Sequence, residues 1–112
     1  MFYPTQSPTV WAVVEGVETA ESGRKVEFSF DIKVKRITFP ELQALYARAA
    51  EEGLTDFEAI KDLVLDWRKV GTPEEGATPF SAEGLQQFMA ALGGAPFIRA
   101  LNRVMPKAKE KN

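Results

Sequence analysis

The sequence predicts an α+β domain in which an N-terminal antiparallel β-hairpin is followed by about four α-helices, so that the fold is mostly helical. Apolar and polar residues alternate without a break over residues 25–35, which indicates a strand. Thr38 and Glu41 have the spacing of a capping box, and apolar residues recur at helical spacing after them. A chain of 112 residues with these elements is predicted to form a single domain over residues 1–112.

The N-terminal part is predicted to be an extended arm followed by the hairpin. Residues 1–8 contain two prolines and several short polar residues, which favour an extended arm. A β-rich stretch runs from Val10 to Val17, and Gly23 permits the turn that follows it. We therefore predict a β-hairpin over residues 9–37. Because a lone two-stranded ribbon is marginally stable in water, its apolar face must lie on helices or gain a strand from another chain.

The helical part is predicted over residues 38–105, and it begins with two helices. Thr38 caps the first helix and Gly53 ends it. Thr55 caps the second, which we expect to run as one amphipathic helix up to Gly71. Its apolar side chains cover an arc of roughly 140° at 100° per residue. They are Phe57, Ile60, Leu63, Val64, Trp67 and Val70.

Two further helices are predicted after a loop over residues 72–80. Ser81 caps the third helix, and the glycines at 93 and 94 interrupt the chain after it. Pro96 suits the first turn of the fourth helix. Pro106 stops that helix, and residues 106–112 are expected to form a flexible basic tail.

The composition excludes the commonest catalytic and metal sites. The chain has no Cys and no His, so it has no disulfide, no zinc site of Cys and His, and no Ser-His-Asp or Cys-His site. We expect no cofactor. The net charge of −2 argues against nucleic-acid binding, although it hides a net −6 over residues 41–83 and a net +4 over residues 84–112. No apolar run is long enough for a membrane span and no secretory signal is evident, so we expect a cytosolic protein that does not bind membranes.

Three carboxylates are the main candidates for chemistry. Glu58, Asp62 and Asp66 fall at i, i+4 and i+8 on the polar side of the predicted second helix. They would be an acidic stripe for a basic partner, ligands that share a metal ion, or an ordinary solvated face. The solvated face is favoured, because like charges at this spacing destabilise a helix by only a few tenths of a kcal/mol each and so need no special purpose. No nucleophile in the sequence has an evident base, so we expect a protein that is not an enzyme.

Several short motifs resemble those of the small tail assembly chaperones of long-tailed bacteriophages and prophages. Residues 33–42, KVKRITFPEL, resemble the passage from a strand through a basic stretch into an acidic helix in that family. Residues 63–70, LVLDWRKV, are similar to its segment with an apolar pair, Trp and Val. Residues 76–81, GATPFS, with Leu85 after them, resemble its approach to the next helix. Residues 96–101, PFIRAL, resemble its last helix, and the resemblance covers about residues 26–105.

The resemblance implies a non-catalytic protein of the bacterial host cytoplasm. Chaperones of this family bind the long, aggregation-prone tape measure protein and help the tail-tube protein to polymerise around it. The client-binding residues that we expect are Leu65, Trp67, Phe80, Arg99 and Arg103. Leu65 is apolar outside the apolar arc, and the arginines would steer an acidic partner. Self-association would cover free apolar faces in the absence of the client, so a homo-oligomer is also considered.

A second hypothesis is a structural phage component. In this alternative the chain is a tail or head–tail connector subunit that uses the hairpin for strand addition to its neighbours. A chaperone is absent from the finished virion, whereas such a subunit is part of it.

Overall fold

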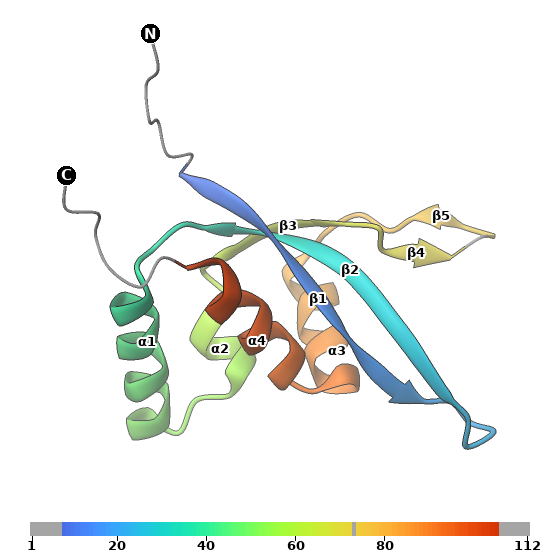
Figure 1. The fold of residues 1–112 in the computed structure, drawn as a ribbon, viewed down its shortest axis with the longest axis horizontal. Coiled ribbons are helices and arrows are strands. Elements are labelled where there is room, and N and C mark those ends of the chain that lie inside the picture. Colours follow the sequence, from blue (N-terminus) through green and yellow to red (C-terminus); the bar gives the residue numbers. More distant parts are fainter. Residues whose placement is uncertain (1–7, 73, 106–112) are drawn as a thin grey trace, which may run out of the picture.

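The computed structural model describes residues 8–72 and 74–105, which form nine elements (Figure 1). In chain order they are β1 (Thr9–Thr19), β2 (Lys25–Lys35), α1 (Phe39–Glu52), α2 (Asp56–Ile60), β3 (Val64–Arg68), β4 (Gly71–Thr72), β5 (Gly76–Ala77), α3 (Ala82–Leu92) and α4 (Ala95–Val104). The predicted tail over residues 106–112, and all of the predicted arm except Pro8, lie outside the described residues.

The predicted α+β class with four helices is confirmed, but the prediction of a mostly helical chain is wrong. Of the described residues, about 42% are helical and 31% lie in strands, because the sheet contains a third strand that was predicted to be helical. β1 pairs antiparallel with β2, as expected for the hairpin, and β2 pairs antiparallel with β3. The strand order in this sheet is therefore β1-β2-β3.

The helix predicted from Thr55 to Gly71 ends instead at Ile60. Its start is as predicted, because the Thr55 hydroxyl accepts from the backbone N–H of Glu58 and the Glu58 carboxylate accepts from that of Thr55, both at 3.1 Å. Beyond residue 63 the chain becomes strand β3. Its inward side chains, Val64 and Trp67, are three residues apart, because the register between β2 and β3 shifts at Lys33/Val34. A bulge thus produces a spacing of three on one face of a strand, which resembles the spacing of an amphipathic helix.

The other helix boundaries follow their caps. Thr38 accepts from the backbone N–H of Glu41 in a complete capping box, and Gly53 adopts a left-handed φ of 67° at the end of α1. Ser81 accepts from the backbone N–H of Gly84 at the start of α3. Between β3 and α3, the predicted loop over residues 72–80 contains all of the small second sheet except Gly71, and in this sheet β4 pairs antiparallel with β5.

The helices cover one face of the β1-β2-β3 sheet, and the core lies between them (Figure 1). Ala12 and Val14 of β1, opposite Ile32 and Phe30 of β2, point into this core. Helix α4 packs along β1, although the two lie near opposite ends of the chain. The largest fully buried side chains come from both layers: Phe97, Ile32, Leu42, Ile60, Leu85, Leu101, Val14 and Val34.

The turn end of the β1–β2 hairpin extends beyond the helices (Figure 1). The apolar face predicted for residues 25–35 is therefore buried from Phe30 onwards, while Val26 is 41% exposed and Phe28 only half-buried. The Phe28 ring lies over Gly16 of β1, where an added Cβ would come within 2.8 Å of the ring. Glycine is needed here because the ring occupies the space of a side chain.

Candidate partner-binding surface

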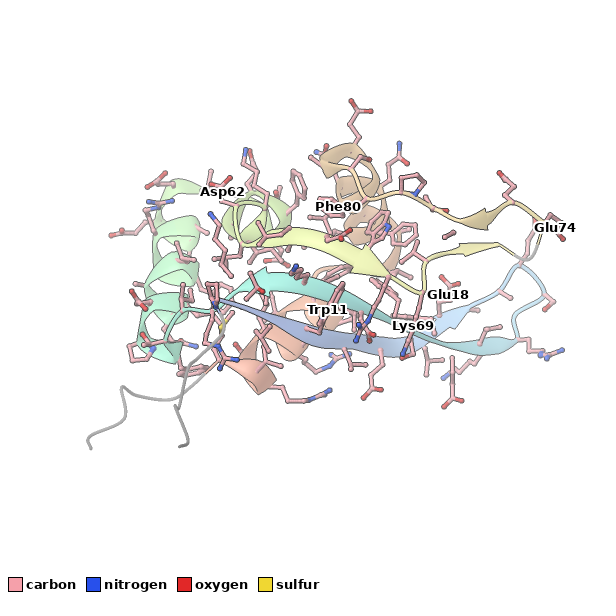
Figure 2. All side chains as sticks on the ribbon, turned by 90° about the horizontal axis from the view of Figure 1, so that it is seen from above. Trp11, Glu18, Asp62, Lys69, Glu74 and Phe80 are labelled. Carbon is pink, nitrogen blue, oxygen red and sulfur yellow. The ribbon has the colours of Figure 1, made fainter. Side chains whose placement is uncertain are left out.

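The face of the β1-β2-β3 sheet that points away from the helices is the best candidate for a functional surface. We call it the outer face, and its central part consists of Trp11, Val13, Asp31, Lys33, Leu65, Asp66, Arg68 and Lys69. Figure 2 views the molecule from the side of this face and labels Trp11 and Lys69. Val13 of β1 and Leu65 of β3, the two edge strands, are each 41% exposed and are the large apolar side chains that this part of the face presents to solvent.

A buried carboxylate, that of Asp31 on β2, lies at the centre of the outer face. The side chain of Asp31 is only 5% exposed, and Arg68 Nε donates to its Oδ2 atom at 2.7 Å. Lys69 Nζ lies 3.4 Å from the same oxygen. The Arg68 guanidinium carbon is also 4.0 Å from the centre of the Trp11 ring. Arg68 of β3 therefore extends across β2 to β1 and ties the three strands together.

Electrostatics keep Asp31 ionised. The hydrogen bond from Arg68 lowers the pKa of Asp31 below its usual value, with a further contribution from Lys69, although burial acts in the opposite direction. Lys69 has a φ of 67°, a left-handed conformation that is uncommon for a residue other than glycine. This conformation ends β3 and accompanies the return of the Lys69 ammonium group toward Asp31.

Of the five residues predicted to bind a partner, Trp67 lies in the core. It is 6% exposed, stacks on Phe88 with ring centres 5.0 Å apart, and donates from Nε1 to the Thr78 carbonyl oxygen at 2.7 Å. Phe80, labelled in Figure 2, packs edge-on against the same ring at 5.2 Å and is half-buried. Among the five predicted residues, Trp67 and Phe80 are the two that contact each other in the described part of the chain. Both rings stabilise the loop between β5 and α3.

The remaining three predicted residues are exposed on two different elements. Leu65 belongs to the outer face because the bulge turns it and Asp66 outward. Arg99 and Arg103 are exposed on α4, and Arg103 Nη1 lies 3.6 Å from a carboxylate oxygen of Glu15 on β1. The structure therefore does not gather the five residues into one site.

The predicted carboxylate stripe does not form, because the helix that would carry it ends early. Glu58 lies on α2, Asp62 in the following turn and Asp66 on β3. The Glu58 carboxylate accepts hydrogen bonds at the N-cap, and Asp66 accepts from the backbone N–H of Trp67 at 2.8 Å. In the described ranges, no group of three or more acidic side chains is placed to hold a metal ion. No helix in these ranges is long and apolar enough to cross a membrane.

Sequence reasoning missed the cluster of Asp31, Arg68 and Trp11. One signal pointed to the outer face: residues 10–17 are apolar at odd as well as even positions, so both faces of that strand carry apolar side chains. Nothing in the sequence indicated that Arg68 pairs with Asp31, because Arg68 is 37 residues away and was predicted to lie on a helix.

A scan against protein-family models found no match for this chain, and searches of the curated proteins and of the solved structures found none either.

Proposed function

We propose that this protein is a non-catalytic tail assembly chaperone of a long-tailed phage or prophage. In the bacterial host cytoplasm it binds the tape measure protein and assists assembly of the tail-tube protein around it. The observation that carries the proposal is the resemblance of residues 26–105 to that family, above all the order and spacing of Trp67, residues 76–81 and Leu85.

The motif residues between Trp67 and Gly84 form a single packing unit, which supports the proposal. The Trp67 ring contacts Phe80, and its Nε1 bonds to the Thr78 carbonyl oxygen. Ser81 caps α3, and Gly84 leaves room for the Trp67 ring. Residues up to 17 positions apart in sequence thus have one physical role, which is to join β3 to α3. Such an arrangement explains why their spacing would recur in related proteins.

The outer face supplies the apolar surface that a client-binding protein needs. Val13 and Leu65 are exposed there, beside the half-buried Trp11 ring. Trp and Arg are enriched among the residues that dominate binding energies at interfaces, and Arg68 covers the Trp11 ring. We therefore assign client binding to this face.

The alternative function, a structural tail or head–tail connector subunit, is favoured by a different observation. The turn end of the β1–β2 hairpin carries Val17, 57% exposed, and Val26 on opposite faces. A hairpin end with an exposed valine on each face fits a permanent contact with a neighbouring subunit.

Co-expression with the tape measure protein of the same phage tests the proposal. We expect wild-type protein to raise the soluble fraction of the client and to co-purify with it. The double variant Val13→Asp/Leu65→Asp should lose both effects, while Gln86→Asp, on the exposed side of α3, keeps them. An equally insoluble client with and without this protein would refute the chaperone, and mass spectrometric detection of the chain in purified virions would favour the structural subunit.

A further inference from the structure

The outer face is about as wide as one helix, and its strands have no free backbone N–H or C=O groups that point toward a partner on the face. Neighbouring strands lie about 4.8 Å apart, so three strands present a surface about 10 Å across, close to the diameter of an α-helix. A strand is added to a sheet at its edge, where free N–H and C=O groups lie, and not on its face. A partner on the face must satisfy its own backbone hydrogen bonds, as a helix does. The opposite face of this same sheet is covered by helices.

The apolar side chains of the outer face lie on its two edge strands, on either side of charged side chains of β2, and we call this strip across the strands the band. Trp11 and Val13 lie on β1, and Leu65 lies on β3. The side chains between them on β2 are Asp31 and Lys33, of which Asp31 is buried beneath Arg68. An apolar stripe on a helix would contact Val13 and Leu65 and the exposed side of the Arg68–Trp11 pair.

Among the accessible charged side chains around this band, cations outnumber carboxylates by three to two. The side chains of Arg68 and Lys69 are 52% and 68% exposed, and Lys33 is half-buried on the neighbouring strand. Asp31 is buried and offsets part of the charge of the two cations that it bonds, and Asp66 is exposed but accepts a backbone N–H of its own strand. Glu15, two residues beyond Val13, is 57% exposed and lies 3.6 Å from Arg103 of α4. The chain as a whole carries a net charge of −2, so the excess of cations around the band is a local feature. Its electrostatic complement is an acidic surface.

From these three observations we infer that the outer face binds an amphipathic α-helix whose apolar stripe is bordered by Asp and Glu side chains. This inference rests on the proposed function and names the chemistry of the client segment. Two aliphatic side chains in the band favour a helix over single-stranded nucleic acid, which binds proteins through stacking on several aromatic rings and through phosphate contacts.

Two synthetic peptides of about 18 residues, or five helical turns, test the inference. Both carry the same leucine stripe, and the remaining positions are mainly Glu in one and Lys in the other. We expect the full chain to bind the Glu peptide about tenfold more tightly in fluorescence anisotropy, and the gap to shrink when salt is raised to about 0.5 M. In NMR titrations of the isotope-labelled chain, the amide shifts caused by the Glu peptide should cluster on β1, β2 and β3.

A pair of charge variants localises the effect. Lys33→Gln/Lys69→Asn should weaken binding of the Glu peptide by about three- to tenfold, and Asn is chosen because it tolerates the positive φ at Lys69. The matched control Arg48→Gln/Lys61→Gln also removes two exposed cations and should change the affinity less than about twofold.

Three outcomes would overturn the inference: equal affinity for the two peptides, shifts that cluster on helices, or displacement of the Glu peptide by a single-stranded oligonucleotide. Self-association that buries β1 to β3 and excludes the peptide would overturn it as well. Each of these outcomes leaves the proposed function standing if the protein still solubilises the tape measure protein. Failure to solubilise that client removes the proposed function whichever peptide binds.

Discussion

Gly84 of α3 lies directly against the Trp67 ring. A methyl group at Gly84 would come within 2.9 Å of the Cη2 atom of Trp67 and within 3.1 Å of the Ser81 hydroxyl oxygen. The ring cannot withdraw, because Phe88 stacks on it and Thr78 accepts its N–H. The glycine is therefore a packing residue, although helix propensity alone would disfavour it in a helix.

This contact reverses the usual effect of replacing a helical glycine by alanine. Such a replacement normally stabilises a helix by about 1 kcal/mol, whereas forcing a methyl group into a filled site costs about 1–3 kcal/mol. We expect Gly84→Ala to lower the free energy of unfolding in urea, and Gln86→Ala, on the exposed side of the same helix, to leave it unchanged within about 0.5 kcal/mol. A higher thermal midpoint for Gly84→Ala would contradict the packing described here.

Stability and client binding should separate at Leu65 and Trp67. Leu65→Asp changes an exposed side chain, so we expect a stability change below about 1 kcal/mol together with loss of the co-purified client. Trp67→Ala removes a buried ring and its hydrogen bond and should cost about 3–5 kcal/mol. Thermal denaturation of both variants measures the change in stability, and pull-down of the client measures the change in binding. Retention of the client by a folded Leu65→Asp variant would exclude Leu65 from the binding surface.

The ion pairs of Asp31 predict a loss of stability in acid. The folded pKa of Asp31 lies below its unfolded value of about 3.9, so the ionised carboxylate contributes stability above that pH. This contribution is lost as the pH falls below about 4 and through the folded pKa. Asp31→Asn should be less stable than wild type by about 1–3 kcal/mol at pH 7, and the difference should shrink in acid. Urea unfolding at pH 7, 4 and 3 measures it, with Glu51→Gln as the control for an exposed carboxylate.

Tyr46 of α1 predicts a loss of stability in alkali. Its hydroxyl is buried without a hydrogen-bond partner among the described residues, and burial, aided by the charge of Asp56, raises the pKa of Tyr46 to about 12. Because the folded chain keeps the proton that the unfolded chain loses near pH 10, stability falls as the pH rises from 10 to about 12.

Replacing this tyrosine isolates the effect. Tyr46→Phe should not show the loss of stability between pH 10 and 12 that the tyrosine causes. At pH 7 it should be as stable as wild type, or more stable by up to about 1 kcal/mol, because an unsatisfied hydroxyl is removed. Unfolding curves followed by tryptophan fluorescence at pH 7, 9 and 11 compare the two. A Tyr46→Phe variant that is clearly less stable at pH 7 would show that the hydroxyl has a partner.

The parts of the fold that depend on near neighbours in the sequence could be predicted. The caps at Thr38, Thr55 and Ser81 each involve a residue three positions away, and all three are found as expected. The strand over residues 25–35 was readable because the outer side of β2 is polar throughout. These features require no knowledge of what packs against them.

The third strand and the outer-face cluster could not be predicted, because both depend on register. Val64 and Trp67 have helical spacing only because of a bulge, and the bulge is defined by pairing with Lys33 and Val34, about thirty residues earlier. Once residues 64–68 are placed on a strand, Arg68 falls opposite Asp31 and the cluster follows. Assigning a helical period to residues 64–68 thus hid both the third strand and the ion pair between Arg68 and the buried Asp31.

The packing of α4 along β1 has a consequence for how the protein is made. During synthesis the β1–β2 hairpin leaves the ribosome before α4, and the inner side of β1, with Ala12 and Val14, stays uncovered until residues 95–104 follow. Contacts between segments so far apart in sequence form late in folding. A nascent chain that stops before α4 would carry an uncovered apolar sheet and is expected to aggregate. Until its last described helix emerges, the proposed chaperone itself needs protection.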